Sequence, residues 1–385
     1  MTPLVALRVA LVRLGFALGR LRPVRARVVL ATAHGDHISG NLTWIREGIR
    51  DRVPDATVIE LAHRPGGGWR GLVGAGVHAL RAGWHLASAS LFVVDDYYFP
   101  MYVIRPRTKT RFVQVWHACG AFKKFGYSVL DKGFGADEAY VRSIPIHANY
   151  DLCLVSAARF APFYAEAFRM PIDRFTSALG IPRTDLFFDA ERRARATEAV
   201  RRRYAIPDGK RVVLYAPTFR GERVTVARDP TELDLAAIHA ALGDDHVVLL
   251  RSHPFVRSRL AADPALRGFV IDASDHPDMN ELMLVSDVLV TDYSSAMYEF
   301  ALLERPIAFF APDHAAYEGE RGFYLDWPGD LPGPVFETTD GLAAWLRAGA
   351  FDLGRVRAFR AAAFDVADGR ATARFVEEVV LPAIG

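Results

Sequence analysis

Two histidines lie where apolar, strand-like runs of the sequence end. His117 directly follows residues 112–116, and His253 follows residues 247–251 within Arg-Ser-His-Pro. An imidazole has an unperturbed pKa of about 6.5, so it can accept a proton from a hydroxyl at neutral pH. Ligands of open parallel sheets bind beyond the carboxyl ends of the strands. We therefore predict that His117 and His253 are catalytic, although a lone histidine at such a position can equally be bonded to a loop carbonyl.

A polar turn separates a strand-like run from a helix-like run within residues 287–299. Ser294 and Ser295 stand at the start of the expected helix, which should run to about Leu303. Free backbone amides and the helix dipole at such a start attract phosphate groups. Helix capping alone would also explain Asp292 and Ser294, and capping and phosphate binding can coexist.

Arginines follow other strand-like runs. Arg220 and Thr218 come after residues 212–215, Arg251 ends residues 247–251, and Arg183 lies in Gly-Ile-Pro-Arg-Thr-Asp. A guanidinium suits planar contacts to phosphate oxygens, whereas the alternative is an ordinary surface arginine. The pattern favours a cleft that collects cations against a pyrophosphate.

Common metal motifs and the P-loop are missing from the sequence. There is no His-x-x-x-His or Cys-x-x-Cys spacing and no Gly-x-x-x-x-Gly-Lys. These spacings are typical of metal and nucleotide sites. We predict no metal and no cofactor, so that any nucleotide would be a substrate held in a cleft.

Alternating strand-like and helix-like runs predict the elements that position these residues. A chain of 385 residues exceeds one ordinary core. We predict an α/β, GT-B-like fold of two doubly wound Rossmann-like domains that face a central cleft, with domains at residues 1–188 and 204–385 and a helical connection at 189–203. The expected strands cover residues 28–33, 57–61, 91–94, 112–116, 152–155, 212–215, 247–251, 269–271, 288–291 and 307–310.

The composition is that of a globular protein with a basic N-terminus. Hydrophobic residues make up 51% and charged residues 24%, the net charge is +2, and two cysteines suggest a reducing compartment. Before Asp36 there are six arginines among leucines and no acidic residue. Arg8 and Arg13 argue against a membrane span, and the interrupted apolar run argues against a signal peptide. Two alternatives stay open, which are an interfacial helix on anionic lipid and a helix packed on the first domain with solvated arginines.

Together, several motifs resemble the CDP-glycerol glycerophosphotransferases, a family that includes teichoic-acid polymerases and primases. The resemblance covers most of the chain and rests on Trp116-His117, residues 180–185, 215–220, 253–254, 288–299, 305–307 and 368–370. It implies that His117 and His253 are the catalytic pair. It also implies donor contacts from Arg183, Thr218, Arg220, Arg251, Thr291, Asp292, Ser294, Ser295 and Glu299. Many members have Trp-His-Gly, and the Trp-His-Ala found here looks more like the primase-like branch.

The resemblance implies transfer of a glycerol-phosphate or related polyol-phosphate unit from a CDP-activated donor to a hydroxyl of a lipid-linked cell-wall or capsule polymer, with release of CMP. We expect a peripheral protein at the cytoplasmic face of the cell membrane, with no nucleic-acid partner. One alternative is a GT-B glycosyltransferase that uses a nucleotide sugar, because a fold alone does not determine the transferred group. A second is a non-catalytic, membrane-recruited subunit that binds an anionic polymer. The polyol, the acceptor and the oligomeric state stay open.

Overall fold

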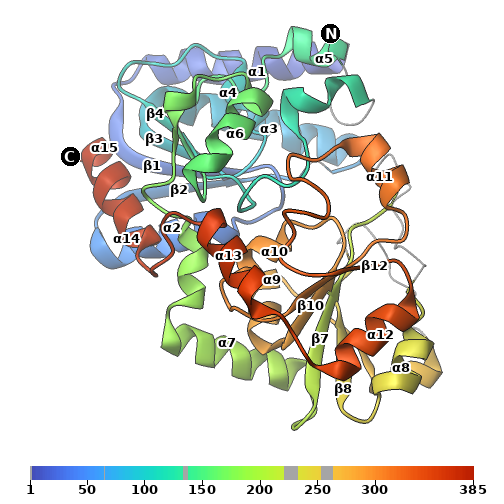
Figure 1. Cartoon of the computed structure of the whole chain (residues 1–385). Coiled ribbons are helices and arrows are strands. Elements are labelled where there is room, and N and C mark those ends of the chain that lie inside the picture. The colour runs from blue at the N-terminus through green and yellow to red at the C-terminus, as the bar shows by residue number, and fades with distance from the viewer. Residues whose placement is uncertain (1, 65, 133–137, 221–232, 253–262) are drawn as a thin grey trace. The chain divides into compact units, whose positions relative to one another are not determined.

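The chain folds into two α/β units, each built on a six-stranded parallel sheet (Figure 1). This computed structural model describes residues 2–64, 66–132, 138–220, 233–252 and 263–385. Unit 1 comprises Met1–Ala118, Phe125–Asp185 and Phe364–Gly385, and unit 2 comprises Cys119–Lys124 and Leu186–Ala363. The predicted α/β class with two doubly wound domains is confirmed.

The sheet of unit 1 has the strand order β2-β1-β3-β4-β5-β6. Its strands are β1 (Arg25–Thr32), β2 (Thr57–Ala62), β3 (Ala89–Val94), β4 (Arg111–Gln114), β5 (Leu152–Leu154) and β6 (Phe175–Thr176). The helices of this unit are α1 (Pro3–Arg20), α2 (Gly40–Arg52), α3 (Gly68–Ser88), α4 (Phe99–Tyr102), α5 (Glu138–Ser143), α6 (Ala161–Phe168), α14 (Ala371–Phe375) and α15 (Leu381–Ile384). The strand order reverses between β1 and β3, which makes their carboxyl ends the topological switch point of this sheet.

The sheet of unit 2 has the order β12-β11-β10-β7-β8-β9. Its strands are β7 (Arg211–Ala216), β8 (His246–Leu250), β9 (Val270–Asp272), β10 (Val288–Thr291), β11 (Ile307–Phe310) and β12 (Val335–Phe336). The helices are α7 (Ala190–Arg203), α8 (Leu235–Leu242), α9 (Met279–Val285), α10 (Ala296–Ala301), α11 (His314–Arg321), α12 (Thr339–Ala348) and α13 (Leu353–Ala363). Here the order reverses between β7 and β10, so the second switch point lies at their carboxyl ends.

Alternate residues of the second sheet form one face of a hydrophobic core. This face packs against apolar residues of α8 and α12, which lie beside the sheet in Figure 1. The sheet contributes Val213, Tyr215, Val248, Leu250, Val288, Val290, Ala308 and Phe310, and the two helices contribute Leu235, Ile238, Leu242, Leu342, Ala343 and Leu346. Because side chains alternate across a strand, the other face of each strand is free to pack on helices of the opposite layer.

Every predicted strand is present, and its ends lie within three residues of the prediction. The two-residue strands β6 and β12 were not predicted, because so short a pair has no detectable periodicity. The strand predicted to end at Trp116 ends at Gln114 instead. Trp116 has a positive φ of 53°, and a left-handed backbone cannot continue a strand.

The observed division differs from the predicted domains of residues 1–188 and 204–385. The segment predicted as a connection at 189–203 forms α7 within unit 2, and Phe364–Gly385 returns to unit 1. Buried hydrogen bonds explain this return, because the Asp185 carboxylate accepts from the backbone amides of Ala371 and Thr372 at 2.9 and 2.8 Å. Asp365 likewise accepts from the Ser177 hydroxyl at 2.6 Å.

The N-terminal helix α1 packs on α3 through glycines that bring the two backbones close together. A Cβ added to Gly83 would lie 2.1 Å from the carbonyl oxygen of Val12, and one added to Gly15 would lie 2.1 Å from that of Leu80. Small residues at such positions allow close helix contact. The structure thus shows a helix packed on the first domain, one of the two alternatives left open, with Arg13 donating to the Val103 carbonyl at 3.0 Å and Arg8 lying over the ring of Phe99. Among the described residues, no helix combines the length and the apolar character needed to cross a membrane.

We predict that Gly83→Ala lowers the free energy of unfolding by about 1–3 kcal/mol, because the added methyl group clashes with the α1 backbone. Gly74→Ala in the same helix is the matched control, since its Cβ would meet only His63 Cε1 at an ordinary 3.6 Å. Helix propensity favours alanine there by up to about 1 kcal/mol. Urea unfolding of both variants measures this free energy. Equal changes at the two positions would contradict the close contact between α1 and α3 at Gly83.

Candidate active site

Titratable side chains gather at the carboxyl edge of the first sheet, at its switch point. His34 follows β1, Asp95 and Asp96 follow β3, and His117 follows β4. The Asp96 carboxylate lies 2.5 Å from His34 Nε2 and 3.6 Å from His117 Nδ1. His117 Nδ1 also lies 3.3 Å from the backbone oxygen of Asp95. The predicted base is therefore part of a cluster in which one carboxylate faces two imidazoles.

Buried amide side chains hold the backbone that presents His117. Gln114 Oε1 accepts from the amide of Trp116 at 2.8 Å, and its Nε2 donates to the carbonyl of Asp96 at 3.0 Å. Asn41 Nδ2 donates to the carbonyls of Val115 and Trp116 at 3.0 and 2.9 Å. These bonds compensate the left-handed backbone of Trp116, a kind of strain that is concentrated at functional sites.

Arg183 meets His117 within unit 1. Its Nη1 donates to the backbone oxygen of His117 at 2.5 Å, and its own amide donates to Asn41 Oδ1 at 3.0 Å. The structure thus brings together two of the residues predicted from the sequence. Arg183 supports the same turn that Asn41 and Gln114 hold, and it places a permanent cation beside the imidazole.

The electrostatics of the cluster favour an ionised Asp96 and a neutral His117 at neutral pH. Burial alone would raise the pKa of Asp96, but the neighbouring His117 and His34 bring it below its ordinary value. Desolvation lowers the pKa of His117 against the opposing effect of Asp96. The hydrogen bond to Asp96 raises the pKa of His34. Burial raises the pKa of Asp95 to about 7. A neutral imidazole is the form that can accept a proton.

The closeness of His34, Asp96 and His117 also resembles the ligand set of a metal site. One nitrogen or oxygen atom from each lies within 4.8 Å of the others. Hydrogen bonds to the carboxylate and to a backbone carbonyl account for this closeness, so we interpret the group as a hydrogen-bonded cluster. Sequence spacing could not reveal it, because the three residues follow three different strands.

Predicted donor contacts meet at the switch point of the second sheet. Thr218 donates to Asp292 Oδ1 at 2.9 Å from both its amide and its hydroxyl. Arg220 donates from Nη1 to Asp292 Oδ2 at 2.9 Å and from Nε to Asp313 Oδ2 at 2.5 Å. The Arg220 side chain is only 11% exposed, and its guanidinium also lies 5.2 Å from the ring of Tyr293. The charge expected to face a phosphate is therefore shared with two carboxylates.

Of the other predicted donor residues in unit 2, some have buried side chains and others lie at the start of α10. Thr291 and Glu299 are buried, and the Thr291 hydroxyl donates to the carbonyl of Ala216 at 2.7 Å. Ser294 Oγ accepts from the amide of Ala296, the first residue of α10, at 3.2 Å, whereas the N-cap residue Ser295 makes no side-chain capping bond. This helix ends at Ala301 rather than near Leu303, which gives it only six residues and a modest dipole.

Two further predictions concern the end of β8. Arg251 donates from Nη1 to the carbonyls of Ser252 and Ser274, so its side chain connects the backbone after β8 to the backbone after β9. His253 lies outside the described residues. The convergence of His117 and His253 on one cleft therefore stays a prediction.

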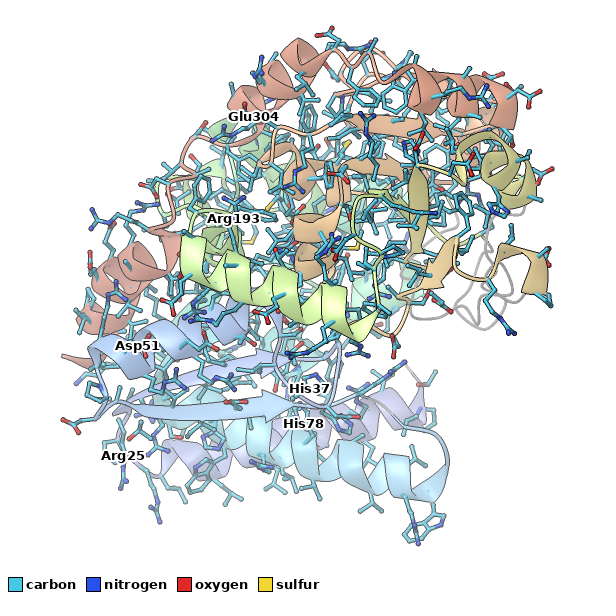
Figure 2. All side chains as sticks on the ribbon, turned by 90° about the horizontal axis from the view of Figure 1, so that it is seen from below. Arg25, His37, Asp51, His78, Arg193 and Glu304 are labelled. Carbon is cyan, nitrogen blue, oxygen red and sulfur yellow. The ribbon has the colours of Figure 1, made fainter. Side chains whose placement is uncertain are left out.

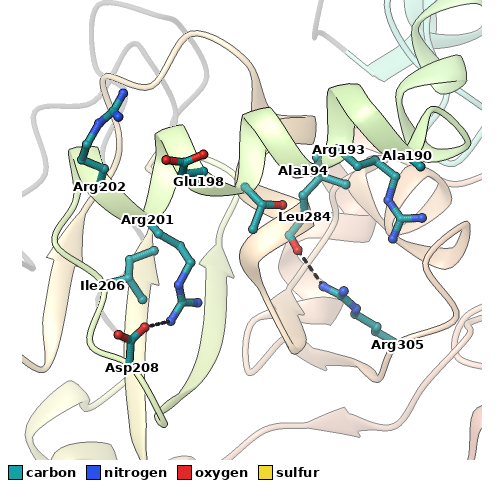
Figure 3. Close-up of a pocket in the computed structure, with 11 residues that line it drawn as sticks. Ala190, Arg193, Ala194, Glu198, Arg201, Arg202, Ile206, Asp208, Leu284 and Arg305 are labelled. Atoms are coloured by element: carbon teal, nitrogen blue, oxygen red, sulfur yellow. Dashed lines mark hydrogen bonds and ion pairs between the residues drawn. The ribbon is translucent and has the colours of Figure 1, made fainter.

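A cavity of about 860 Å³ lies beside α7, away from the residues predicted from the sequence (Figure 3). Its lining carries four arginines and two acidic residues, namely Arg193, Arg201, Arg202, Arg305, Glu198 and Asp208. Arg201 pairs with Asp208 at 3.2 Å, and Arg305 donates to backbone carbonyls at the end of α9, including that of Leu284 at 3.0 Å. Two of the four cations thus have structural partners, and the lining includes no predicted catalytic residue.

Comparison with known proteins identifies the family. Residues 16–381 match the family model described as CDP-glycerol:poly(glycerophosphate) glycerophosphotransferase. The chain belongs to this family. It is therefore a transferase, and the resemblance stated from the sequence motifs is confirmed.

Relatives within the glycerophosphotransferase family include both primases and polymerases. The chain is 36% identical over 363 residues to the teichoic acid ribitol-phosphate primase of Bacillus spizizenii, covering 94% of this chain and 92% of that protein. It is 35% identical to the teichoic acid ribitol-phosphate polymerase TarK of Staphylococcus aureus, over 76% of this chain and 57% of that protein. A solved structure of the wall teichoic acid polymerase TagF shares the fold, with a TM-score of 0.78 and 24% identity over 96% of this chain and 93% of that chain.

Sequence reasoning missed the groups that surround His117. Asp95 and Asp96 directly follow β3, and His34 comes two positions after β1. The rule that singled out His117, a polar residue at the carboxyl end of a strand, applies equally to them. Asn41 carried no such signal, because it lies in α2 and its partners are backbone carbonyls 74 and 75 positions away. Gln114 fell within the strand predicted at residues 112–116, whereas the structure has it as the last residue of β4.

We predict that Arg220→Met lowers the free energy of unfolding by about 3–5 kcal/mol, because it leaves the buried Asp292 without its cation. Arg357→Met is the control. It removes an exposed ion pair with Glu304, which is labelled in Figure 2, and should cost no more than about 1 kcal/mol. Urea unfolding of both variants measures the difference. Similar small losses would mean that Arg220 is not needed to hold the second switch point.

Proposed function

We propose that this chain transfers a polyol-phosphate unit, such as glycerol phosphate or ribitol phosphate, from a CDP-activated donor to a hydroxyl of a lipid-linked polymer acceptor and releases CMP. The observation that carries the proposal is the presentation of His117 at the first switch point, with Nδ1 facing the Asp95 carbonyl and the Asp96 carboxylate. Its side chain keeps 41% of its surface exposed, so a substrate hydroxyl has access to it. Membership of the glycerophosphotransferase family supports the donor class.

In the proposed reaction, the acceptor hydroxyl gives its proton to Nε2 of His117 while its oxygen bonds to the β-phosphorus of the donor. The bond between this phosphorus and the bridging oxygen breaks, and its electron pair leaves with CMP. A positioned general base typically contributes about 10²- to 10⁴-fold to the rate. Because phosphoryl transfer leaves little covalent work to the protein, stabilisation of the phosphate charge is the larger task.

The donor phosphates are assigned to the second switch point. The turn at residues 291–295 is proposed to supply backbone amides and the hydroxyl of Ser295, and His253 is proposed to add positive charge. Arg183, in unit 1, stays a predicted donor contact. The ion pairs of Arg220 with Asp292 and Asp313 support a modified role for this residue. We propose that Arg220 serves mainly to shape the turn that carries Asp292.

The relatives support a polyol phosphate as the transferred group and leave two candidates. The primase of Bacillus spizizenii named above matches nearly the full length of both chains, which favours ribitol phosphate and addition of a single unit. The polymerase relative TarK is matched over 57% of its own length, so polymer extension has weaker support here.

We predict that the purified chain forms CMP from CDP-ribitol or CDP-glycerol with a lipid-linked acceptor, and that His117→Ala lowers kcat by about 10²- to 10⁴-fold. Chromatography of CMP and mass spectrometry of the lipid product measure both. A UDP- or GDP-sugar should give no product.

Each alternative function has its own outcome in this assay. Turnover of a nucleotide sugar without turnover of either CDP-polyol would favour a glycosyltransferase. Failure to form CMP from any donor, with the chain folded, would favour a non-catalytic polymer-binding subunit. If folded His117→Ala keeps a kcat close to that of the wild type, then His117 is not the general base.

We also propose that the outer faces of α1 and α3 dock on an anionic membrane surface. Large apolar side chains on these faces are about half exposed or more, namely Leu4, Leu7, Leu14, Leu18, Leu21, Trp69, Leu72, Val73 and Val77. Neither helix contains an acidic residue, whereas Arg13, Arg20, Arg70 and Arg81 are exposed. An apolar helix face flanked by arginines is typical of interfacial binding. Packing of α1 on α3 and membrane docking thus use different faces of α1.

We predict that Leu7→Gln/Leu14→Gln/Leu18→Gln lowers the association constant for phosphatidylglycerol-containing vesicles more than about tenfold, because it removes apolar area from the interface. Ile172→Gln/Leu381→Gln removes exposed apolar residues elsewhere in unit 1 and should bind like wild type. Co-sedimentation measures both, and added salt should weaken wild-type binding. Equal vesicle binding by the two variants would show that the outer faces of α1 and α3 are not the membrane-binding surface.

A further inference from the structure

We propose that Asp96 is the positioning residue of His117, and that its carboxylate, anchored by His34, holds the imidazole as the Nδ1–H tautomer with the basic lone pair on Nε2. This inference rests on the proposed role of His117 as the general base. It adds a function for a carboxylate that no sequence motif singled out. It also explains why a second histidine stands beside the first.

The geometry shows how one carboxylate can serve both imidazoles. Oδ2 of Asp96 lies 2.5 Å from His34 Nε2, while Oδ1 lies 3.6 Å from His117 Nδ1. Among the described residues, this Oδ1 is buried and has no hydrogen-bond partner. A small rotation of the His117 ring toward it would complete the bond, and catalytic hydrogen bonds are commonly long before substrate binds.

The ring of His117 is restrained on its other sides. It stacks on Trp116 with 4.5 Å between ring centroids, and the edge of His34 approaches it with 4.9 Å between centroids. With Nδ1 directed at the Asp95 carbonyl and the Asp96 carboxylate, both acceptors favour a proton on this nitrogen. A carboxylate that orients a histidine base also stabilises the imidazolium formed when the base takes up a proton.

The backbone of Asp96 is tied to the strand that carries His117. Gln114, the last residue of β4, donates from Nε2 to the Asp96 carbonyl and accepts from the Trp116 amide. Its side chain therefore bridges the ends of β3 and β4. The distance between carboxylate and imidazole is consequently set by neighbouring strands of one sheet, which are rigid supports for a site.

The decisive test is a double-mutant cycle in kcat for CMP release from CDP-ribitol or CDP-glycerol, whichever the wild type turns over. Asp96→Asn should lower kcat at least about 30-fold and change the donor KM less than about threefold. Asp96→Asn/His117→Ala should be no slower than His117→Ala alone, because Asp96 acts only through the imidazole. His34→Gln should give a smaller loss, about three- to tenfold. Asp51→Asn, which changes an exposed residue of α2 that is labelled in Figure 2, is the matched control and should leave kcat unchanged.

The pH dependence of kcat/KM gives a second test. It should stay unchanged in Asp96→Asn if Asp96 has only a structural role. The charged and titratable groups that face His117 are Asp96, Asp95, His34 and Arg183. Since the Asp96 charge raises the pKa of His117, its removal should shift the acid limb of kcat/KM to lower pH. Burial raises the pKa of Asp95 to about 7, so a change in the pH profile could also come from this residue. If the shift comes from His117, then the pH profile of His117→Ala should not move when Asp96→Asn is added.

Nitrogen NMR of ¹⁵N-histidine-labelled protein tests the inference without substrate. At pH 8 the His117 resonances, assigned by their loss in His117→Gln, should report Nδ1–H in the wild type and a tautomer mixture in Asp96→Asn. An unchanged tautomer together with near wild-type kcat in Asp96→Asn would overturn the inference. If the wild type forms no CMP from any donor, the proposed function fails instead, and the NMR result still decides whether Asp96 holds the tautomer.

Discussion

The left-handed backbone of Trp116 is the constraint on which the candidate site depends. Its positive φ ends β4 at Gln114 and turns the next residue, His117, toward the Asp96 carboxylate. A bulky residue disfavours this conformation by about 1–3 kcal/mol. The buried amides of Gln114 and Asn41 offset that cost with hydrogen bonds to this turn. The strain is therefore coupled to the placement of His117.

The two switch points use the same topology for different chemistry. In unit 1 a carboxylate faces imidazoles, which gain and lose protons near neutral pH. In unit 2 the carboxylate of Asp292 faces Arg220, which stays protonated at any physiological pH. An arginine held by two carboxylates cannot exchange a proton with substrate, but it can hold a loop in one shape. The described groups that can exchange protons near neutral pH thus lie at the first switch point, whereas Arg220 and its two carboxylates are suited to holding a turn in shape.

The fold was largely predictable because its central strands are buried on both faces. Runs such as 288–291 and 307–310 are mostly apolar and rich in β-branched or aromatic residues, and the structure places β10 and β11 at the same bounds. The strand-end rule placed His117 and Thr218 just beyond two strands, and the structure has them three and two residues beyond the ends of β4 and β7, respectively. Short strands such as β6 escaped prediction because two residues carry no period.

The remaining features could not be predicted because they depend on partners that are distant in the sequence. Nothing local to Arg220 indicates that Asp313, 93 positions away, neutralises it. Nothing local to Phe364–Gly385 indicates a return to unit 1, which depends on Asp185 meeting amides 186 and 187 positions away. Asp96 illustrates the same limit, since its role follows only when β3 and β4 are neighbours in the sheet. A residue type at a strand end predicts where chemistry can occur, and its pairing across the sheet decides whether its charge is available for that chemistry.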